Sequence, residues 1–335
     1  MLFAKKTAAE KRASFREELA TGRLLQFPGA HSPIVSLAIE EQGFDGVYIS
    51  GAALSAELGL PDIGLTTLTE VTQRGRQIAR VTDLPALIDI DTGFGEPMSA
   101  ARSILELEEL GIAGCHLEDQ ENPKRCGHLD NKNIVPVREM TMKIRAAADA
   151  RKDPNFLIMA RTDARASEGL QASLDRAKAY IDAGADVIFP EALQDMSEYE
   201  AVREALDVPL LANLTEFGKT PLLTKKQLED LGYNIAIYPV TSLRLSMKAV
   251  EDGLAAIRQQ GTQEHIVDRM QTRARLYELI RYEDYTSSIR IFSTSKFDGR
   301  ETGNGGETHE EKREEEGESQ KHQGEEGRGG GPCHL

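Results

Sequence analysis

Short runs rich in aliphatic and β-branched residues recur between residues 24 and 240, and each run is followed by a stretch with apolar residues at helical spacing. Short apolar runs of this kind indicate buried strands. Eight of them can be recognised, at residues 24–27, 47–50, 86–91, 115–118, 157–161, 187–190, 210–213 and 235–238. The chain therefore predicts eight strands separated by helices.

The segments between these runs have the pattern of amphipathic helices. Residues 99–111 and 170–184 place apolar residues at helical spacing, and each ends in glycine, a common helix stop. Strands that alternate with helices form a parallel sheet, and eight strands favour closure into an α/β fold of the (β/α)8 TIM-type barrel class. An open, doubly wound sheet is the alternative.

Helical patterns also flank this repeat. Residues 1–20 mix basic and acidic side chains, which predicts a surface helix and not a secretory signal, because a signal needs an apolar core. Residues 242–260 and 263–285 predict extra C-terminal helices that pack outside the barrel or on a neighbouring subunit. No apolar run reaches the roughly 18 residues that a membrane span needs, so we expect no membrane partner.

The composition changes abruptly near residue 299. Residues 299–335 hold ten Gly and ten Glu against five Lys or Arg, with almost no apolar side chain. A segment with so little to bury cannot offset its conformational entropy, so it predicts a disordered acidic tail. The expected organisation is one barrel domain with its C-terminal helices over residues 1–298, followed by this tail.

The charge balance narrows the choice of partner. Of the 335 residues, 55 are acidic and 40 basic, which gives a formal net charge of −15. Nucleic-acid binding needs a basic face, so we expect a small-molecule ligand and no nucleic acid. Cys115, Cys126 and Cys333 are too scattered for a disulfide framework, which favours a reducing compartment, the cytoplasm.

Polar residues follow most of the predicted strands, and a barrel enzyme keeps its site at that end. Asp89 and Asp91 lie two positions apart and share a strand face, while Glu118 ends the next strand. Three crowded carboxylates need a cation or protons to balance them, and oxygen ligands alone favour Mg²⁺ or Mn²⁺ over zinc. The alternative is an ordinary strand end with one exposed Asp and one helix-capping Asp.

The loop after the fourth predicted strand holds a second candidate. Cys126 lies among the basic side chains Lys124, Arg125 and His128, which favour its reactive thiolate form. Proline and glycine in this loop permit a bent, mobile segment that closes over a ligand as a lid. An exposed cysteine without chemistry is the alternative. Cys115, inside a predicted strand, we assign to core packing.

Residues 124–128, K-R-C-G-H, resemble the K-[KR]-C-G-H signature of the isocitrate lyase and phosphoenolpyruvate mutase superfamily. Residues 89–91 and 118–119 resemble its metal site, and the resemblance covers roughly residues 5–290. Three further segments are most similar to the superfamily lyases that cleave 2-methylisocitrate, at residues 50–52, 60–62 and 213–218.

The resemblance implies a (β/α)8 barrel that cleaves 2-methylisocitrate to pyruvate and succinate, a carbon–carbon lyase of the methylcitrate cycle in propionate catabolism. The implied chemistry is retro-aldol (retro-Claisen), in which a base removes the hydroxyl proton and one fragment leaves as an aci-carboxylate. Mg²⁺, with Mn²⁺ as a substitute, would act as a Lewis acid on the pyruvate-forming half. Its implied ligands, bound directly or through water, are Asp62, Asp89, Asp91 and Glu118.

The resemblance also implies roles for single side chains. Cys126 would protonate the succinate-forming fragment, with His128 as a further catalytic residue, and the base is either Tyr48 or a water or hydroxide on the metal. Arg161 would pair bidentately with a substrate carboxylate. The other implied substrate contacts are Ser50, Gly51, Ala52, Gly127, Glu191, Asn213, Leu214, Thr215, Arg244 and Arg273.

Other functions stay open at this point. Oxaloacetate acetylhydrolase and dimethylmalate lyase share the scaffold, the acidic residues and the lid cysteine, and the size of the substrate side group decides among them. Outside the enzymes, a noncatalytic barrel that binds a metabolite is the alternative. In resembling proteins the helices after the eighth strand are exchanged between subunits, which implies a homotetramer.

Overall fold

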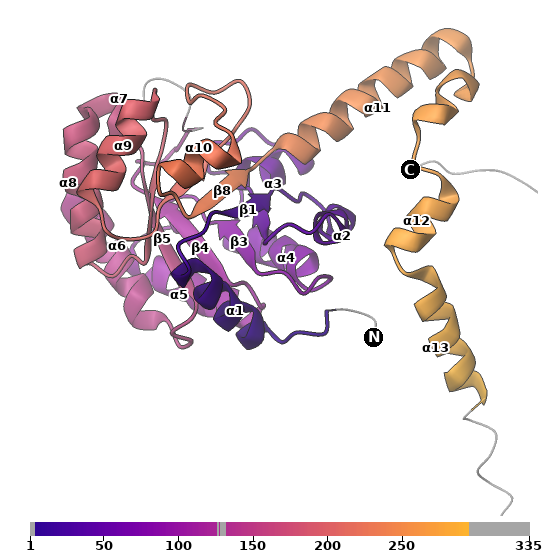
Figure 1. Ribbon diagram of the computed structural model, residues 1–335, viewed down its shortest axis with the longest axis horizontal. Coiled ribbons are helices and arrows are strands. Elements are labelled where there is room, and N and C mark those ends of the chain that lie inside the picture. Colours follow the sequence, from indigo (N-terminus) through magenta and orange to yellow (C-terminus); the bar gives the residue numbers. More distant parts are fainter. Residues whose placement is uncertain (1–3, 126, 128–131, 295–335) are drawn as a thin grey trace, which may run out of the picture. The chain divides into compact units, whose positions relative to one another are not determined.

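The alternating strands and helices fold into a closed barrel (Figure 1). The computed structural model describes residues 4–125, 127 and 132–294, with side chains up to residue 289. Within this part of the chain lie eight parallel strands: β1 (Leu25–Pro28), β2 (Val47–Ile49), β3 (Ala86–Asp89), β4 (Gly114–Glu118), β5 (Leu157–Thr162), β6 (Val187–Pro190), β7 (Leu211–Asn213) and β8 (Ile235–Tyr238).

Two hydrogen-bonded sheets make up the barrel wall. One has the strand order β2-β3-β4-β5-β6 and the other the order β1-β8-β7. Single bridges, Gly29 to Tyr48 and Ile188 to Leu210, join the two sheets. Because β8 also pairs with β1 over four residues, the strands close on themselves. The predicted (β/α)8 barrel is therefore confirmed, and the open sheet is not formed.

Helices connect successive strands around the outside of the barrel, and further helices follow β8 (Figure 1). They are α1 (Ala8–Ala20), α2 (Pro33–Glu41), α3 (Gly51–Glu57), α4 (Leu68–Ala79), α5 (Pro97–Glu109), α6 (Val137–Ala150), α7 (Ala164–Glu168), α8 (Leu170–Asp182), α9 (Met196–Ala205), α10 (Lys225–Asp230), α11 (Thr241–Gln260), the 3₁₀ helix η1 (Glu264–Arg269), α12 (Arg273–Leu279) and α13 (Tyr282–Thr294).

Alternation along the strands creates two hydrophobic layers. Leu87 on β3 belongs to the cluster inside the barrel, whereas Ala86 and Ile88 belong to the layer between the strands and the helices. Cys115 on β4 is completely buried in that outer layer, as predicted. A strand face that points inward thus stays apolar until the strand approaches its carboxyl end.

The N-terminal helix α1 closes the amino-terminal end of the barrel, which corrects the prediction of a simple surface helix. Phe15 and Leu19 pack into the cluster inside the barrel. Lys11 and Arg12 are 5% exposed, and both donate hydrogen bonds to backbone carbonyls that precede β3 and β4. The charged residues of this segment suggested a helix exposed to water. Instead, the Lys11 and Arg12 side chains are hydrogen-bonded to backbone carbonyls.

The C-terminal region also differs from its prediction. The single helix expected over residues 263–285 is divided into η1, α12 and part of α13, because Thr272 is extended and Arg281 has a positive φ of 56°. The chain divides into two units, residues 1–288 and 289–335, and the predicted tail lies outside the described residues. Across the described part of the chain, we find no helix with the length and apolarity for membrane crossing.

Candidate active site

The strands deliver polar side chains to the carboxyl end of the barrel. On β5, Leu157 and Met159 lie in the inner cluster, and Arg161 follows them on the same face. Residues at this end enclose a cavity of about 80 Å³, which we call the strand-end cavity. Its lining is Tyr48, Ser50, Ala52, Asp62, Asp89, Lys124, Gly127, Arg161, Phe189, Glu191, Asn213, Thr215, Pro239, Val240 and Arg244.

Two aspartates at the end of β3 face the start of α3. Asp89 Oδ2 accepts a hydrogen bond from the Gly51 amide at 3.1 Å, and Asp89 Oδ1 accepts one from the Asp91 amide at 3.0 Å. A Cβ atom at position 51 would lie 2.9 Å from Asp89 Oδ2 and 3.2 Å from Asp91 Oδ1. Asp91 lies beyond the strand with φ of 49°, so a turn, and not only the strand period, brings the two carboxylates together.

Lys124, from the loop after β4, lies between Asp91 and the loop after α3. Its Nζ atom is 2.7 Å from Asp91 Oδ1 and 2.5 Å from Asp62 Oδ1, and its side chain is 3% exposed. Burial acts to lower the pKa of Lys124, but the surrounding carboxylates, led by Glu118 and Asp89, raise it. The ammonium is therefore a permanent positive charge inside the acidic cluster.

The two aspartates differ in how readily they take a proton. Burial and the Asp89 carboxylate raise the pKa of Asp91 to about 6, against the opposing effect of Lys124. Burial also acts to raise the pKa of Asp89, but His116, Lys124 and Arg161 outweigh it and hold that pKa below its usual value. Asp89 is thus ionised at neutral pH, and Asp91 is the member that protonates first.

Arg161 lies among three carboxylates. Its Nε and Nη2 donate to the two oxygens of Asp163 at 2.9 and 3.2 Å, Nη1 is 3.2 Å from Glu191 Oε2, and Nε is 3.2 Å from Glu118 Oε2. Burial acts to lower the pKa of Arg161, but these carboxylates raise it, while burial raises the pKa of Glu118 well above its usual value. The guanidinium is held in one orientation at the cavity, where it can bind an anionic group.

Gly127 places the backbone of the loop against this cluster. A Cβ atom at position 127 would collide with Arg161 Nη2 and would lie 2.6 Å from Glu191 Cγ, so glycine is needed at this close approach. The two catalytic residues expected in the same loop, Cys126 and His128, lie outside the described residues. Their roles stay predictions.

Tyr48 on β2 and His116 on β4 form a buried pair. Tyr48 Oη is 2.6 Å from His116 Nε2, and the two rings are stacked with an interplanar angle of 9°. Burial lowers the pKa of His116 to about 4 and raises the pKa of Tyr48 well above its usual value. At pH 7 the imidazole is neutral and the phenol keeps its proton, so the pair can pass a proton without carrying a charge at rest.

The other wall of the cavity comes from β6, β7 and α11. Asn213 Nδ2 is 3.2 Å from Glu191 Oε2, and Thr215 follows two residues later on the same face. Arg244, in the first turn of α11, has its Nη1 atom 2.9 Å from Glu216 Oε2. Amide, hydroxyl and guanidinium groups therefore face the acidic wall across the cavity.

Most of the predicted site residues meet at this place, and two do not. Gly51, Asp91 and Glu118 contact the lining residues through the distances given above. Leu214 packs in the outer hydrophobic layer, and Arg273 is exposed at the start of α12, beyond the 20 residues of α11. Neither Leu214 nor Arg273 lines the strand-end cavity.

The sequence analysis did not include His116 and Asp163 among the site residues. It gave Lys124 only as a basic neighbour of Cys126, not as a partner of the acidic cluster. A signal for the first two was present, because His116 lies two positions before Glu118 and Asp163 two positions after Arg161. The same period that joined Asp89 to Asp91 places each of them on an inward-facing strand edge. No comparable signal places Lys124 between two carboxylates, since the path of its loop decides that contact.

The acidic cluster has the chemistry of a site for a hard divalent cation. Its donors are buried carboxylate oxygens, and they converge on a positive charge, the Lys124 ammonium. In residues 4–125, 127 and 132–294, no three His, Cys, Asp or Glu side chains surround one point as a metal centre does. The Lys124 ammonium lies between Asp62 and Asp91. By donor type and charge the residues fit Mg²⁺ or Mn²⁺.

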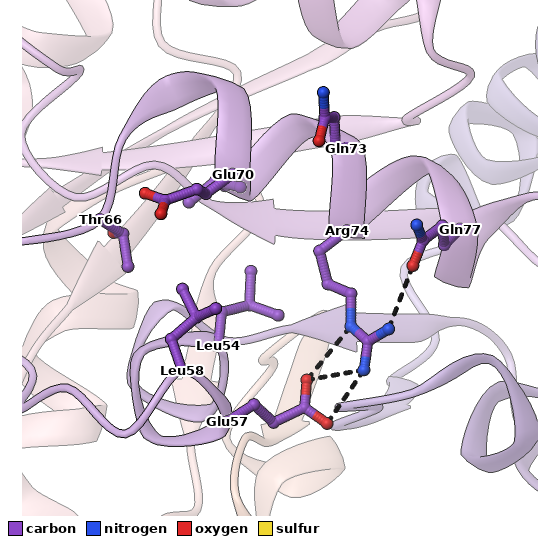
Figure 2. A pocket seen from close by; sticks show the side chains of 9 residues that line it. Leu54, Glu57, Leu58, Thr66, Glu70, Gln73, Arg74 and Gln77 are labelled. Carbon is purple, nitrogen blue, oxygen red and sulfur yellow. Dashed lines mark hydrogen bonds and ion pairs between the residues drawn. The ribbon is translucent and has the colours of Figure 1, made fainter. Parts of the chain in front are cut away.

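A larger hollow, of about 370 Å³, lies outside the barrel between α3 and α4 (Figure 2). Its arginine is already paired: Arg74 Nη2 is 2.9 Å from Glu57 Oε2, and Arg74 Nη1 donates to Gln77 Oε1. This hollow has a larger volume than the strand-end cavity. We place the candidate site in the smaller cavity because the buried ionisable groups with shifted pKa values collect there.

Comparisons with known proteins identify the family of this chain. A family model described as phosphoenolpyruvate phosphomutase matches residues 15–258. The chain is 60% identical over 276 residues to a probable 2-methylisocitrate lyase 1 of Corynebacterium glutamicum, a match that covers 82% of this chain and 90% of that protein. It is 48% identical to a 2-methylisocitrate lyase of Bacillus subtilis, over 81% of this chain and 89% of that one.

Solved structures show the same architecture. A structure of oxaloacetate acetylhydrolase in complex with the inhibitor 3,3-difluorooxalacetate superposes with a TM-score of 0.80 at 32% identity, covering 86% of this chain and 97% of that one. Phosphonopyruvate hydrolase in complex with oxalate and Mg²⁺ superposes with a TM-score of 0.75 at 29% identity, covering 86% and 99%.

Proposed function

This chain belongs to the phosphoenolpyruvate phosphomutase family, and from that premise we propose that it is a carbon–carbon lyase that cleaves 2-methylisocitrate to pyruvate and succinate. The observation that carries the proposal is 60% identity to a probable 2-methylisocitrate lyase over 82% of the chain. The buried ionisable groups at the strand ends support it, because cleavage of a tricarboxylate needs cationic groups for its carboxylates and groups that move protons.

Two arginines are the groups that would bind the substrate carboxylates. Arg161 is held by Asp163, Glu118 and Glu191 with its guanidinium at the cavity. Arg244 approaches from the opposite wall. We propose that the substrate binds between these two arginines, beside the acidic cluster that also lines the cavity.

The proton transfers need one base and one acid. The substrate hydroxyl loses its proton, and the carbon–carbon bond breaks. The electron pair of that bond remains on the succinate-forming carbon, which then takes up a proton. We propose Tyr48 as the base. It would accept the proton of the substrate hydroxyl while it passes its own phenol proton to the neutral His116. We propose Cys126 as the acid that protonates this carbon, with His128 as a further catalytic residue. A reactive thiol also suits a reducing cytoplasm.

Asp89 and Asp91 would hold Mg²⁺, with Asp62 and Glu118 as further oxygen ligands or partners of its water. When bound, the cation would supply Lewis-acid stabilisation of the developing negative charge. Lys124 would then give up its contact with at least one of Asp62 and Asp91. The Mg²⁺ in the family structure of phosphonopyruvate hydrolase with oxalate supports a metal requirement.

The small volume of the strand-end cavity supports a closed conformation around the site. Ligand pockets for small molecules usually measure about 300–1,000 Å³, whereas this cavity measures about 80 Å³. Lys124 and Gly127, both from the loop after β4, line it. We propose that the loop after β4 moves outward to admit substrate and returns to exclude water during cleavage, as expected for a lid.

The proposal is tested by measuring both products with purified full-length protein and Mg²⁺. Pyruvate and succinate should form in equal amounts from 2-methylisocitrate, and kcat/KM should fall about 10- to 200-fold for isocitrate, which lacks the methyl group. Oxaloacetate and 2,3-dimethylmalate are the parallel substrates. Preferred turnover of either one would assign the chain to the corresponding alternative, and turnover of none would favour the noncatalytic barrel.

We also propose that the chain assembles as a homotetramer. In the single chain α11 has no buried residue, although Leu245, Val250 and Leu254 are apolar and are 48–69% exposed. Apolar side chains along a long helix favour burial against another subunit. Light scattering at micromolar concentration should give four times the mass of the chain, and a monomer would contradict the assembly.

A further inference from the structure

Lys132 is a buried lysine just beyond the residues with predicted catalytic roles. Its side chain is 2% exposed. Its Nζ atom is 2.6 Å from Asp163 Oδ1 and also donates a hydrogen bond to the carbonyl oxygen of Gly127. A buried ammonium is stable only when it is paired, and Lys132 is paired with two groups that both contact Arg161.

The backbone around Lys132 is fixed where the loop after β4 returns to the barrel. The Glu121 amide donates to the Asn133 carbonyl at 2.9 Å, and the Val135 amide donates to the Asp119 carbonyl at 2.8 Å. The outgoing and returning parts of the loop are thus hydrogen-bonded at their base. Lys132 extends from this rigid base toward the cavity.

Asp163 connects Lys132 to Arg161. Its carboxylate accepts from Arg161 Nε at 2.9 Å and from Arg161 Nη2 at 3.2 Å, and its Oδ1 atom is shared with Lys132 Nζ. Glu118 and Glu191 also contact Arg161. Asp163 and Glu191 alone place more negative than positive charge around the guanidinium, and Lys132 balances the charge of Asp163.

Gly127 is the second connection. Its carbonyl accepts from Lys132, and its α-carbon lies so close to Arg161 and Glu191 that a Cβ atom would collide with them. Lys132 therefore fixes both the carboxylate that orients Arg161 and the backbone packed against Arg161.

We propose that Lys132 is a positioning residue, which neutralises Asp163 and seats Gly127 so that Arg161 can bind a carboxylate of the substrate. The inference rests on the proposed function of Arg161. Without Lys132, the full charge of Asp163 competes with the substrate for Arg161. Arg161 binds the carboxylate in the ground state and in the transition state alike, so its weakening raises KM and leaves kcat nearly unchanged.

The test compares Lys132→Met with Lys11→Met in the full-length protein. Lys11 is also a buried lysine that donates to backbone carbonyls, those of Ala79 and Thr82, at the other end of the barrel. We expect Lys132→Met to raise KM about 10- to 100-fold with kcat within about threefold, because a hydrogen bond to a charged group contributes this much. Lys11→Met should lower the melting temperature and leave KM unchanged.

A binding measurement separates this inference from the proposed reaction. Calorimetry with succinate should show weaker binding to Lys132→Met by a similar factor, and Lys132→Arg, which keeps the charge, should restore most of the affinity. If Lys132→Met does not fold, Lys132→Gln and Lys132→Arg give the same comparison. Equal KM and succinate affinity in the wild type and the folded variants would overturn the inference. No turnover by the wild type would instead overturn the proposed reaction.

Discussion

Buried cationic side chains have different partners at the two ends of the barrel. At the amino-terminal end, Lys11 and Arg12 donate mainly to neutral backbone carbonyls, and the carboxylate that Arg12 contacts, Asp153, is 19% exposed. At the carboxyl end, Lys124 and Arg161 are held by carboxylates that are themselves buried. Charges bound to fixed dipoles stabilise the fold. Ion-paired side chains can exchange partners, so the carboxyl end of the barrel can bind an ionic ligand.

Local geometry supports the same contrast. Asp91 and Ala192, which follow β3 and β6 at the carboxyl end, have positive φ values of 49° and 60°. Within the described residues, Glu118 Oε1 and His116 Nδ1 are buried there without a hydrogen-bond partner, as is Thr82 Oγ1 at the amino-terminal end. Unfavourable backbone conformations and unsatisfied polar atoms cost stability, and they persist at functional sites. Substitutions at the two ends should therefore separate activity from stability.

The largest effect is expected from removing divalent cations. EDTA should abolish turnover, because the developing negative charge is then not compensated, and Mg²⁺ or Mn²⁺ should restore it. The melting temperature should change little, because Lys124 remains to balance Asp62 and Asp91. Assays and thermal scans with and without chelator measure both quantities. Full activity in EDTA would remove the metal from the proposed site.

The Cys126→Ser substitution should come next. Serine keeps the shape and a hydrogen-bond donor but releases its proton far less readily, so cleavage should slow by about 10²- to 10⁴-fold with ligand affinity largely retained. Pyruvate formation and calorimetry check the two parts. Cys115→Ser is the matched control, since Cys115 is completely buried in the outer layer and should affect stability alone. Near-normal turnover by Cys126→Ser would exclude this cysteine from the chemistry.

At the amino-terminal end, Arg12→Met should have the reverse effect. Arg12 binds the Ile112 carbonyl at 2.8 Å and Asp153 Oδ2 at 3.1 Å, so its loss should lower the free energy of unfolding by about 2–4 kcal/mol. The kcat of the folded enzyme should stay within about twofold. Denaturant unfolding and initial rates measure the two quantities.

Arg23→Met is the control for that variant. The Arg23 side chain is 44% exposed and pairs with Glu18 and Asp45 at the surface, where ion pairs contribute about 0–1 kcal/mol. Its unfolding free energy should therefore stay close to the wild-type value. A large loss of kcat in Arg12→Met, without a matching loss in Arg23→Met, would contradict the division of roles between the two ends.

The smallest effect is expected from truncation after Phe297. The removed segment is rich in Gly and Glu and has almost nothing to bury, so melting temperature, kcat and KM should all match the full-length protein. A drop of several degrees in melting temperature would show that residues 298–335 belong to the folded structure.

The sequence was sufficient for the barrel because local and global signals agree there. Apolar runs specify strands such as β6 and β8, whose bounds match the prediction. The strand period that joins Asp89 to Asp91 also runs back along β3, where Leu87 lies in the inner cluster and Ile88 in the outer layer. The same rule brought Asp89 and Arg161 to one end, since parallel strands share their carboxyl edge.

Other features depend on tertiary contacts that no local pattern encodes. Lys124 lies between Asp62 and Asp91 because of the path of its loop, and α1 buries Lys11 because the barrel end supplies carbonyls for it. Arg273 was expected in the pocket from family resemblance alone. In the single chain it is exposed beyond α11.

Within the described residues, single bridges at Gly29–Tyr48 and Ile188–Leu210 connect the two sheets, so the barrel wall has two seams. The strand-end cavity crosses them, with Asp89 and Arg161 on the five-stranded sheet and Asn213 on the three-stranded one. The seams have fewer paired positions than the five between β4 and β5, so we expect the cavity to vary in width across the seams more than along the strands. Amide hydrogen exchange should be faster at the seams than at the β4–β5 pairing. A wall of this kind can adapt to substrates of different width while the strands that carry the acids keep their register.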